Sequence, residues 1–191
     1  MTDPERAADV AAAMSALDRR AFLPPEQVEF AAEDRPLPLG HGQTNSQPST
    51  VAAMLRLLHV PVGARVLDVG AGSGWTTALL ARLVGPEGSV TGIELEPDLA
   101  VAGAANLAAW GMPWATLDVA HPGVLGRPGP EGYDRILVSA AARELPQSLV
   151  DQLRDGGRMV IPVRRRMLVV ERRGDRIGTS EHGSYLFVPL R

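Results

Sequence analysis

The feature that most constrains this chain is a glycine turn directly after a short apolar run. Residues 66–75 read Val-Leu-Asp-Val-Gly-Ala-Gly-Ser-Gly-Trp, which gives the spacing Gly-x-Gly-x-Gly. Glycine lets the backbone turn tightly and approach a ligand closely, and a buried strand that enters a helix through such a turn is typical of nucleotide-binding α/β proteins. The segment therefore predicts an α/β fold with a ligand at the carboxyl end of this strand.

Short apolar runs alternate with amphipathic stretches along the rest of the chain. We expect helices at residues 4–20, 48–59, 75–84, 97–110 and 146–154, and strands at residues 65–69, 89–95, 114–119, 134–139, 158–163, 167–172 and 185–190. The helix at 146–154 should end at the glycine pair 156–157, and residues 23–48 read as an ordered but irregular segment. The alternation predicts a doubly wound, mostly parallel sheet with helices on both faces and an antiparallel C-terminal strand.

Composition limits the size of the fold and its partners. A chain of 191 residues with 45% hydrophobic content can close one core, so we expect a single domain over residues 1–191, with residues 1–62 as a helical and loop segment and residues 63–191 as a Rossmann-like core. The net charge of −3 predicts no nucleic-acid partner. The sequence shows no long apolar run and no leader pattern, so we expect a cytoplasmic protein without a membrane span. We also expect a monomer.

The side-chain inventory excludes several chemistries. The chain has no cysteine and all its cationic residues are arginine, which removes a thiolate nucleophile, a Schiff-base lysine and a P-loop lysine. The histidines lack paired metal-ligand spacing, and no metal site is expected. They are His41, His59, His121 and His182.

Two carboxylates flank the glycine turn. Asp68 precedes it, and Glu94 follows at the end of the next expected strand, where a carboxylate can accept hydrogen bonds from both ribose hydroxyls of an adenosine. Asp68 would be poorly placed beside a pyrophosphate but can bind the ammonium group of a methionine moiety. The pattern favours S-adenosyl-L-methionine over NAD and so a class I, Rossmann-like methyltransferase. A plain connecting turn, with Asp68 as a solubilising charge, is the alternative.

Further segments resemble one family, the protein-L-isoaspartate (D-aspartate) O-methyltransferases. They are residues 36–48, 134–142, 156–163 and 187–190. The first is the most specific, because the family has Thr-Ile-Ser, a small or polar residue and proline where this chain has Thr-Asn-Ser-Gln-Pro at residues 44–48. The resemblance runs from about residue 21 to the C-terminus. It implies methyl transfer from S-adenosyl-L-methionine to the α-carboxylate of isoaspartyl residues in damaged proteins or peptides, a protein-repair activity, with residues 1–62 on the substrate side.

The resemblance also implies roles for individual residues. Ser46 is the expected catalytic-site hydroxyl, donating to a carboxylate that is already ionised at neutral pH and needs no general base. An alternative role for Ser46 is to cap the following helix. The expected cofactor-binding residues are Gln43, Thr44, Ser46, Asp68, Gly70, Ala71, Gly72, Ser73, Gly74, Glu94, Leu95 and His121.

The chain departs from the family pattern around the adenine site and the substrate entrance. The family usually has Gly-Asp-Gly after its third strand, with the aspartate on the adenine amine; here His121 or Pro122 takes that place, and Asp118 is another candidate. Asn45 replaces isoleucine, Ser49 an aromatic or imidazole residue, and Arg143 a proline. The segment after residue 163 is cut to Arg164–Arg166. Together with Arg172, Arg173 and Arg176, these arginines could receive acidic peptides, or they could form a solvated turn and a charged edge strand.

These departures leave other functions open. One is methylation of a normal aspartate in a dedicated precursor peptide. Another is methylation of a small-molecule acid. A third, from a different class, is a catalytically weak module that only binds S-adenosyl-L-methionine.

Overall fold

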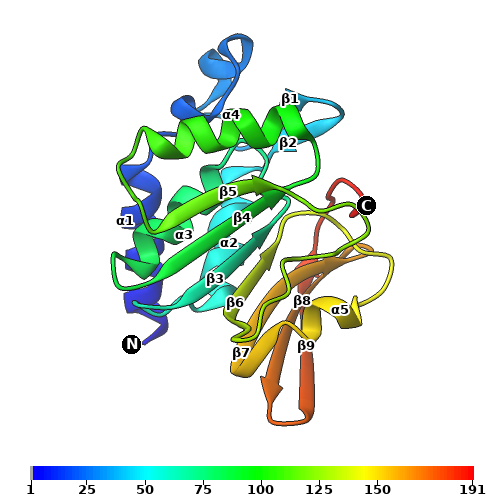
Figure 1. Cartoon of the computed structure of the whole chain (residues 1–191). Coiled ribbons are helices and arrows are strands. Elements are labelled where there is room, and N and C mark those ends of the chain that lie inside the picture. The colour runs from blue at the N-terminus through cyan, green and yellow to red at the C-terminus, as the bar shows by residue number, and fades with distance from the viewer. Residues whose placement is uncertain (1) are drawn as a thin grey trace.

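A computed structural model describes residues 2–191 and places a seven-stranded sheet at its centre, in the order β5-β4-β3-β6-β7-β8-β9 (Figure 1). The strands are β3 (Arg65–Val69), β4 (Ser89–Glu94), β5 (Ala115–Val119), β6 (Tyr133–Val138), β7 (Leu153–Val163), β8 (Arg166–Arg173) and β9 (Arg176–Ser184). Neighbours from β5 to β7 run parallel, whereas β8 and β9 are antiparallel. The predicted α/β fold, with a mostly parallel sheet and an antiparallel end, is confirmed.

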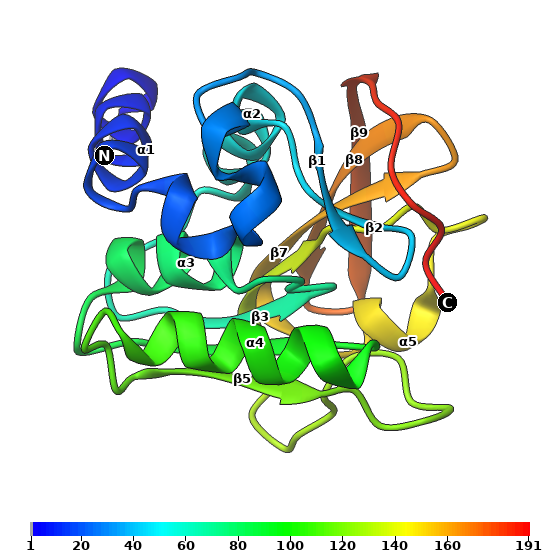
Figure 2. The same ribbon diagram turned by 90° about the horizontal axis from the view of Figure 1, so that it is seen from above.

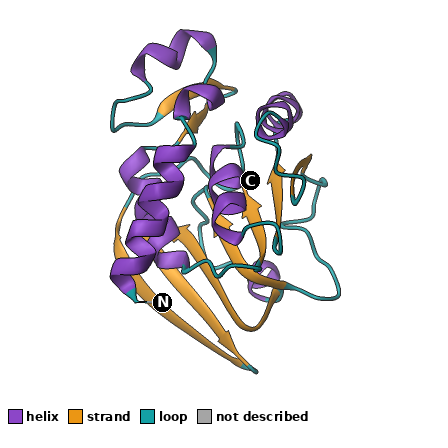
Figure 3. Ribbon diagram, turned by 90° about the vertical axis from the view of Figure 1, so that its left-hand side faces the viewer, coloured by secondary structure: helices purple, strands orange, loops and turns teal. Residues whose placement is uncertain are grey.

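The strands bury both faces, as near-continuous apolar runs predict. Val66 and Leu137 lie in one core cluster, while their neighbours Leu67 and Ile136 lie in the other, because successive side chains of a strand point to opposite faces. Helices α1 (Asp3–Ala16), α2 (Pro48–Leu58), α3 (Trp75–Val84) and α4 (Pro97–Ala108) contribute to the first cluster (Figure 2, Figure 3). The second is covered by the short α5 (Gln147–Val150) and by loops, so the helices are divided unequally between the faces.

The segment predicted to be irregular contains a small hairpin. Strands β1 (Leu37–Gly40) and β2 (Gln43–Asn45) pair antiparallel, and the turn between them has positive φ at Gly40, His41 and Gly42. Before it come two 3-10 helices, η1 (Arg19–Phe22) and η2 (Pro25–Phe30). The opening helix ends at Ala16 rather than at residue 20, because the Asp18 side chain accepts from the backbone N–H of Arg20 and starts the next turn.

The predicted helix at residues 146–154 is wrong, because α5 is a single turn and β7 already begins at Leu153. The glycine pair is not a helix cap but part of a bulge, where the β6–β7 register shifts between Tyr133 and Arg135. Gly156 has φ 73°, and a Cβ on Gly157 would lie 2.7 Å from the carbonyl oxygen of Arg154. Both positions therefore need glycine for the bulge.

The predicted strand at residues 185–190 is also wrong. The last strand, β9, lies earlier in the chain and is almost entirely solvent-exposed, so it lacks the apolar alternation that marks a half-buried strand. Residues 185–191 instead run from the end of β9 to the loop after the central strand β6. The backbone N–H of Ala141 donates to the carbonyl of Val188 at 2.7 Å, and that of Leu190 donates to the carbonyl of Ala141 at 2.9 Å. This tail reaches the carboxyl ends of the central strands.

Residues 2–191 include no helix long and apolar enough to cross a lipid bilayer. We propose that they form one domain, as expected from length, because a single core cluster joins Val10 of α1 and Val51 of α2 with Val66 of β3.

Candidate active site

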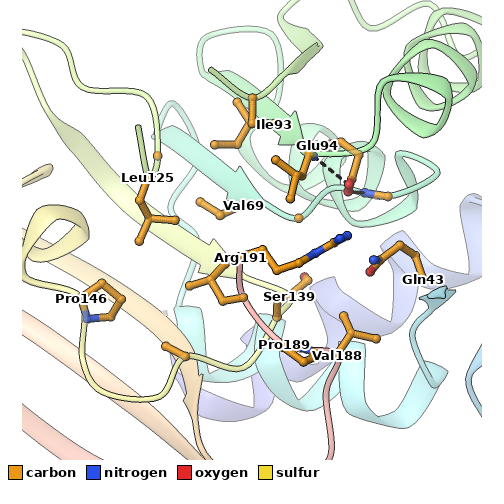
Figure 4. A pocket seen from close by; sticks show the side chains of 18 of the residues that line it. Gln43, Val69, Ile93, Glu94, Leu125, Ser139, Pro146, Val188, Pro189 and Arg191 are labelled. Atoms are coloured by element: carbon orange, nitrogen blue, oxygen red, sulfur yellow. Dashed lines mark hydrogen bonds between the residues drawn. The ribbon is translucent and has the colours of Figure 1, made fainter. Parts of the chain in front are cut away.

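A cleft of about 570 Å³ opens where the carboxyl ends of β3, β4, β5 and β6 meet (Figure 4). The strand order reverses direction at β3, and ligands of open α/β sheets bind at such a switch point. The volume is in the range of small-molecule sites. Of the predicted cofactor residues, those that line it are Gln43, Thr44, Gly70, Gly72, Glu94, Leu95 and His121.

A second, much smaller cavity of about 20 Å³ adjoins the cleft on the side of residues 31–46, called the N-terminal loop below. Thr44, Gly70, Gly72 and Ser139 line both spaces. The predicted residues on the small cavity are Thr44, Ser46, Gly70, Ala71, Gly72 and Ser73. The structure thus brings the proposed catalytic hydroxyl and the glycine turn to the wall of one small space.

The structure gives the helix-capping role to Asp34 rather than Ser46. The N-cap position of α2 is Gln47, and Asp34 accepts from the backbone N–H of Ser49 at 2.8 Å and from Gln47 Nε2 at 3.0 Å. The hydrogen bond from the Ser49 backbone is the main cause of the lowered pKa of Asp34. Ser46 is therefore available to face the small cavity.

Glu94 is a buried carboxylate held in place by the backbone. Its Oε2 accepts from the N–H of Gly72 at 2.8 Å, and its Oε1 accepts from the N–H groups of Leu95 at 2.8 Å and Glu96 at 3.0 Å. Only 6% of the residue is exposed, on the wall of the cleft. A carboxylate has about four acceptor sites and three are occupied here, so Oε2 retains capacity for one ligand hydroxyl.

Asp68 lies beneath the glycine turn and lines neither cavity. Its Oδ2 accepts from the hydroxyls of Thr76 at 2.7 Å and Thr77 at 2.8 Å, whereas its Oδ1 is buried without a hydrogen-bond partner among the described residues. Burial raises the pKa of Asp68 to about 6, partly offset by the two threonines. An unpaired buried carboxylate oxygen is costly, and a cationic group of a ligand could satisfy it directly or through a water.

The three glycines of the turn have different surroundings. All three have positive φ; Gly70 and Gly72 line the cleft, whereas Gly74 lines neither cavity. A Cβ on Gly74 would lie 2.7 Å from the carbonyl oxygen of Gly103 in α4. The third glycine therefore serves the close packing of α3 and α4 rather than contact with a ligand.

The loop after β5 offers His121 to the cleft. Its alternative, Asp118, does not line the cleft and pairs with the guanidinium of Arg127. Leu95, on the same wall, is 40% exposed, so its apolar side chain is accessible to a ligand in the cleft. Among the adenine-site candidates, the geometry favours His121.

Several lining residues are missing from the sequence prediction. Ser139 directly follows β6 and lines both cavities, and Leu125 and Pro146 form an apolar end opposite Gln43 and Glu94 (Figure 4). The position of Ser139 at a strand's carboxyl end was a usable signal. The tail residues 188–191 also line the cleft, and Arg191 reaches across its mouth to pair with Glu96. Nothing local in the sequence marks that tail as part of a site.

Much of the arginine cluster near the C-terminus is engaged by its own neighbours. Arg166 pairs with Glu181 at 3.3 Å, Arg173 pairs with Glu171 at 3.6 Å, and Arg172 donates to the carbonyl of Leu153 at 3.0 Å. These contacts fit a charged edge strand.

This fold and cleft define a class I methyltransferase that uses S-adenosyl-L-methionine. Residues 5–191 match the model of the protein-L-isoaspartate(D-aspartate) O-methyltransferase family. The chain is 45% identical over 183 residues to protein-L-isoaspartate O-methyltransferase of Aeropyrum pernix, covering 93% of this chain and 70% of that protein. It is 43% identical over 186 residues to the one of Methanopyrus kandleri, covering 95% and 82%.

A solved structure has the same fold over nearly the whole chain. It is a protein-L-isoaspartate O-methyltransferase from Plasmodium falciparum in complex with S-adenosyl-L-homocysteine, with a TM-score of 0.81, 27% identity, and coverage of 96% of this chain and 90% of that one. The chain belongs to the protein-L-isoaspartate(D-aspartate) O-methyltransferase family.

Proposed function

We propose that this protein transfers the methyl group of S-adenosyl-L-methionine to the α-carboxylate of isoaspartyl residues in damaged proteins or peptides. The observation that carries the proposal is that the cleft and the small cavity share one wall, formed by Thr44, Gly70, Gly72 and Ser139. A cleft of cofactor size adjoins a space lined by Ser46 that has room for about one water, so Ser46 lies beside the place where a bound methyl donor would meet an incoming carboxylate. Family membership supports the same reaction.

The residues present fit the cofactor. Glu94 would accept from a ribose hydroxyl through Oε2, and Asp68, buried beneath the turn with its Oδ1 unpaired, would attract the ammonium group of the methionine moiety through a bridging water. His121 and Leu95 would bound the adenine. Gly70 and Gly72 let the backbone approach closely, since neither carries a Cβ.

The chemistry requires little from the protein beyond alignment. S-adenosyl-L-methionine supplies an electrophilic methyl group: a carboxylate oxygen forms the new C–O bond while the C–S bond breaks, and its electron pair stays on sulfur. The hydroxyl of Ser46 would orient the carboxylate, which is ionised at neutral pH and needs no base. Opposite charges cancel as the reaction proceeds, so a cleft that excludes water favours it.

Matched peptides test the proposal. Labelled S-adenosyl-L-methionine is offered with an isoaspartyl peptide and its aspartyl twin, and a strong preference for the first is expected, because a shift of one backbone bond misplaces the carboxylate. A misplacement near 1 Å can cost about 100-fold in rate. Equal rates on both peptides would contradict the repair activity, activity on the aspartyl twin alone would indicate a peptide-tailoring enzyme, and cofactor binding without transfer would indicate a binding module.

Ser46→Ala separates the catalytic role from a structural one. Turnover should fall while affinity for S-adenosyl-L-homocysteine stays nearly unchanged, since the hydroxyl acts on the incoming carboxylate rather than on the cofactor. Normal turnover in this variant would remove Ser46 from the reaction. The expectations of a monomer, of a cytoplasmic location and of no nucleic-acid partner stay predictions.

A further inference from the structure

A buried polar network joins the N-terminal loop to the glycine turn. Asn45 is 4% exposed; its Oδ1 accepts from Arg19 Nε at 2.7 Å, and its Nδ2 donates to Ser73 Oγ at 3.1 Å. Arg19 and Ser73 are themselves only 5% and 6% exposed. These three residues form the Arg19–Asn45–Ser73 network. An isoleucine, the residue usual in the family, could make neither hydrogen bond at position 45.

The guanidinium of Arg19 is wrapped by the loop that carries the proposed catalytic residue. Its terminal nitrogens donate to backbone carbonyls of Ala31, Glu33 and Arg35, and also to those of Asn45 and Ser46 at 3.1 and 2.9 Å. Burial lowers the pKa of Arg19 to about 10, so it stays charged at neutral pH. A buried cation needs these acceptors, and residues 31–46 cannot move away without unpairing it.

The other end of the network is anchored in the cofactor-binding core. The carbonyl of Ser73 accepts from Asn106 Nδ2 of α4 at 3.0 Å. Trp75, the first residue of α3, donates from its indole to the carbonyl of Leu17 at 3.2 Å and lies 5.5 Å from the Arg19 guanidinium. The glycine turn and the N-terminal loop are therefore held in one rigid arrangement.

We propose that Arg19 and Asn45 are positioning residues, which hold Ser46 at a fixed place relative to the glycine turn. They thereby couple the cofactor site to the N-terminal loop. The inference rests on the proposed function in one respect, that Ser46 faces the reacting carboxylate. Neither residue needs to touch the substrate. Their effect passes through the backbone carbonyls of residues 45 and 46 and through Ser73.

Asn45→Leu is the principal test, because leucine has a similar shape but makes neither polar contact. We expect kcat/KM for an isoaspartyl peptide to fall about 10- to 100-fold, mostly in kcat, as for a misaligned reacting group. The assay is run well below the unfolding midpoint of each variant. Asn45→Asp is the matched control, since its carboxylate can accept from both Arg19 and the Ser73 hydroxyl, and it should retain most of the activity.

A double-mutant comparison identifies the shared contact. Ser73→Ala should lower kcat less than Asn45→Leu does, and Asn45→Leu/Ser73→Ala should be no slower than Asn45→Leu alone, because both changes remove the same hydrogen bond. Independent, multiplying effects of the two substitutions would overturn the coupling. An unchanged kcat in Asn45→Leu, with only a loss of thermal stability, would also overturn the proposal, because Asn45 would then have a purely structural role.

Amide hydrogen exchange separates this inference from the proposed function. In Asn45→Leu, exchange at residues 37–46 should accelerate at least about tenfold while α3 and α4 are unaffected, as expected for a locally released segment. If the wild type methylates neither peptide but the variant shows this pattern, the proposed function fails and the positioning role stands. If exchange in that segment is unchanged in Asn45→Leu, the positioning role is overturned whatever the wild type methylates.

Discussion

Cofactor affinity should depend most strongly on the carboxylate of Glu94. Glu94→Ala should weaken S-adenosyl-L-homocysteine binding by roughly 1.5–3 kcal/mol, the scale of hydrogen bonds to a charged group, and Glu94→Gln should be intermediate because it loses one acceptor. Titration calorimetry measures both. Glu87→Ala, at an exposed position outside the cleft, is the control. Unchanged affinity in a folded Glu94→Ala protein would exclude Glu94 from the site.

Asp68 should give cofactor binding a pH dependence. Its folded-state pKa of about 6 lies above the ordinary value of 3.8 because of burial, so without ligand its ionisation destabilises the fold. The free energy of unfolding is therefore about 3 kcal/mol higher below about pH 4, where Asp68 is protonated, and this extra stability is lost as the pH rises from 4 through 6. An ammonium group favours the ionised form, and affinity for S-adenosyl-L-homocysteine should therefore decrease below pH 6, by up to about tenfold per pH unit.

Asp68→Asn isolates this effect. Calorimetry from pH 5 to 8 should show weaker binding in the variant with a flatter pH profile, and urea unfolding of the free variant should lack the loss of stability between about pH 4 and pH 6. Parallel pH profiles for wild type and variant would mean that Asp68 does not respond to the ligand.

The sequence alone identifies site residues that belong to a short, local pattern. The glycine turn and Glu94 are recognisable because a strand, a turn and a helix follow one another, and the next strand ends at a fixed distance. The role of Arg19 could not be predicted in this way, because its guanidinium contacts Asn45 and Ser46, which lie 26 and 27 positions further along the chain. Such contacts depend on the packing of α1 and η1 against α3, which no short pattern encodes.

At the scale of elements, the approach of α4 to the glycine turn depends on Gly103. A Cβ there would lie 2.7 Å from the carbonyl oxygen of Gly72 and 2.8 Å from Leu117 Cδ1. Gly103→Ala should therefore destabilise the protein, although alanine favours a helix by about 1 kcal/mol: overpacking costs about 1–3 kcal/mol. It should also weaken S-adenosyl-L-homocysteine binding, because the turn must shift.

The matched control lies one residue earlier in the same helix. Ala102→Gly, at an exposed position, should cost about 1 kcal/mol from helix propensity alone and leave ligand affinity unchanged. Urea unfolding and calorimetry on both variants decide the point. A stabilised Gly103→Ala protein with normal affinity would show that α4 has room to adjust.

The elements that were predicted well are those whose pattern reports burial. Helix α3 has the predicted bounds, and β3 and β8 lie at or within one residue of theirs, because apolar periodicity follows packing against the core. The failures lie where packing is not the cause: β9 is a polar edge strand paired only with β8, and the glycine pair at 156–157 bends β7 instead of ending a helix.

At the scale of the whole molecule, the cleft is assembled from segments that are far apart in the chain. Gln43 and Thr44 come from the N-terminal hairpin, Gly70 and Gly72 from the turn after β3, Glu94 from the end of β4, and residues 188–191 from the tail. The tail is held by backbone hydrogen bonds to Ala141 and by the ion pair of Arg191 with Glu96. A ligand in the cleft would therefore link both ends of the chain to the sheet.

Ligand-induced stabilisation should consequently depend on the tail. A concentration of S-adenosyl-L-homocysteine 100-fold above its Kd stabilises a one-site protein by about 2.7 kcal/mol, which for a domain of this size raises Tm by about 5–10 °C. A variant lacking residues 188–191 should show a smaller rise at the same concentration, because it loses part of the cleft wall, whereas Thr179→Ala on the exposed β9 should show the full rise. Differential scanning calorimetry compares the rise in Tm rather than Tm itself, so a general loss of stability in the truncated chain does not affect the reading. An undiminished rise without the tail would place the tail outside the cofactor site and restrict its contribution to the substrate side of the cleft.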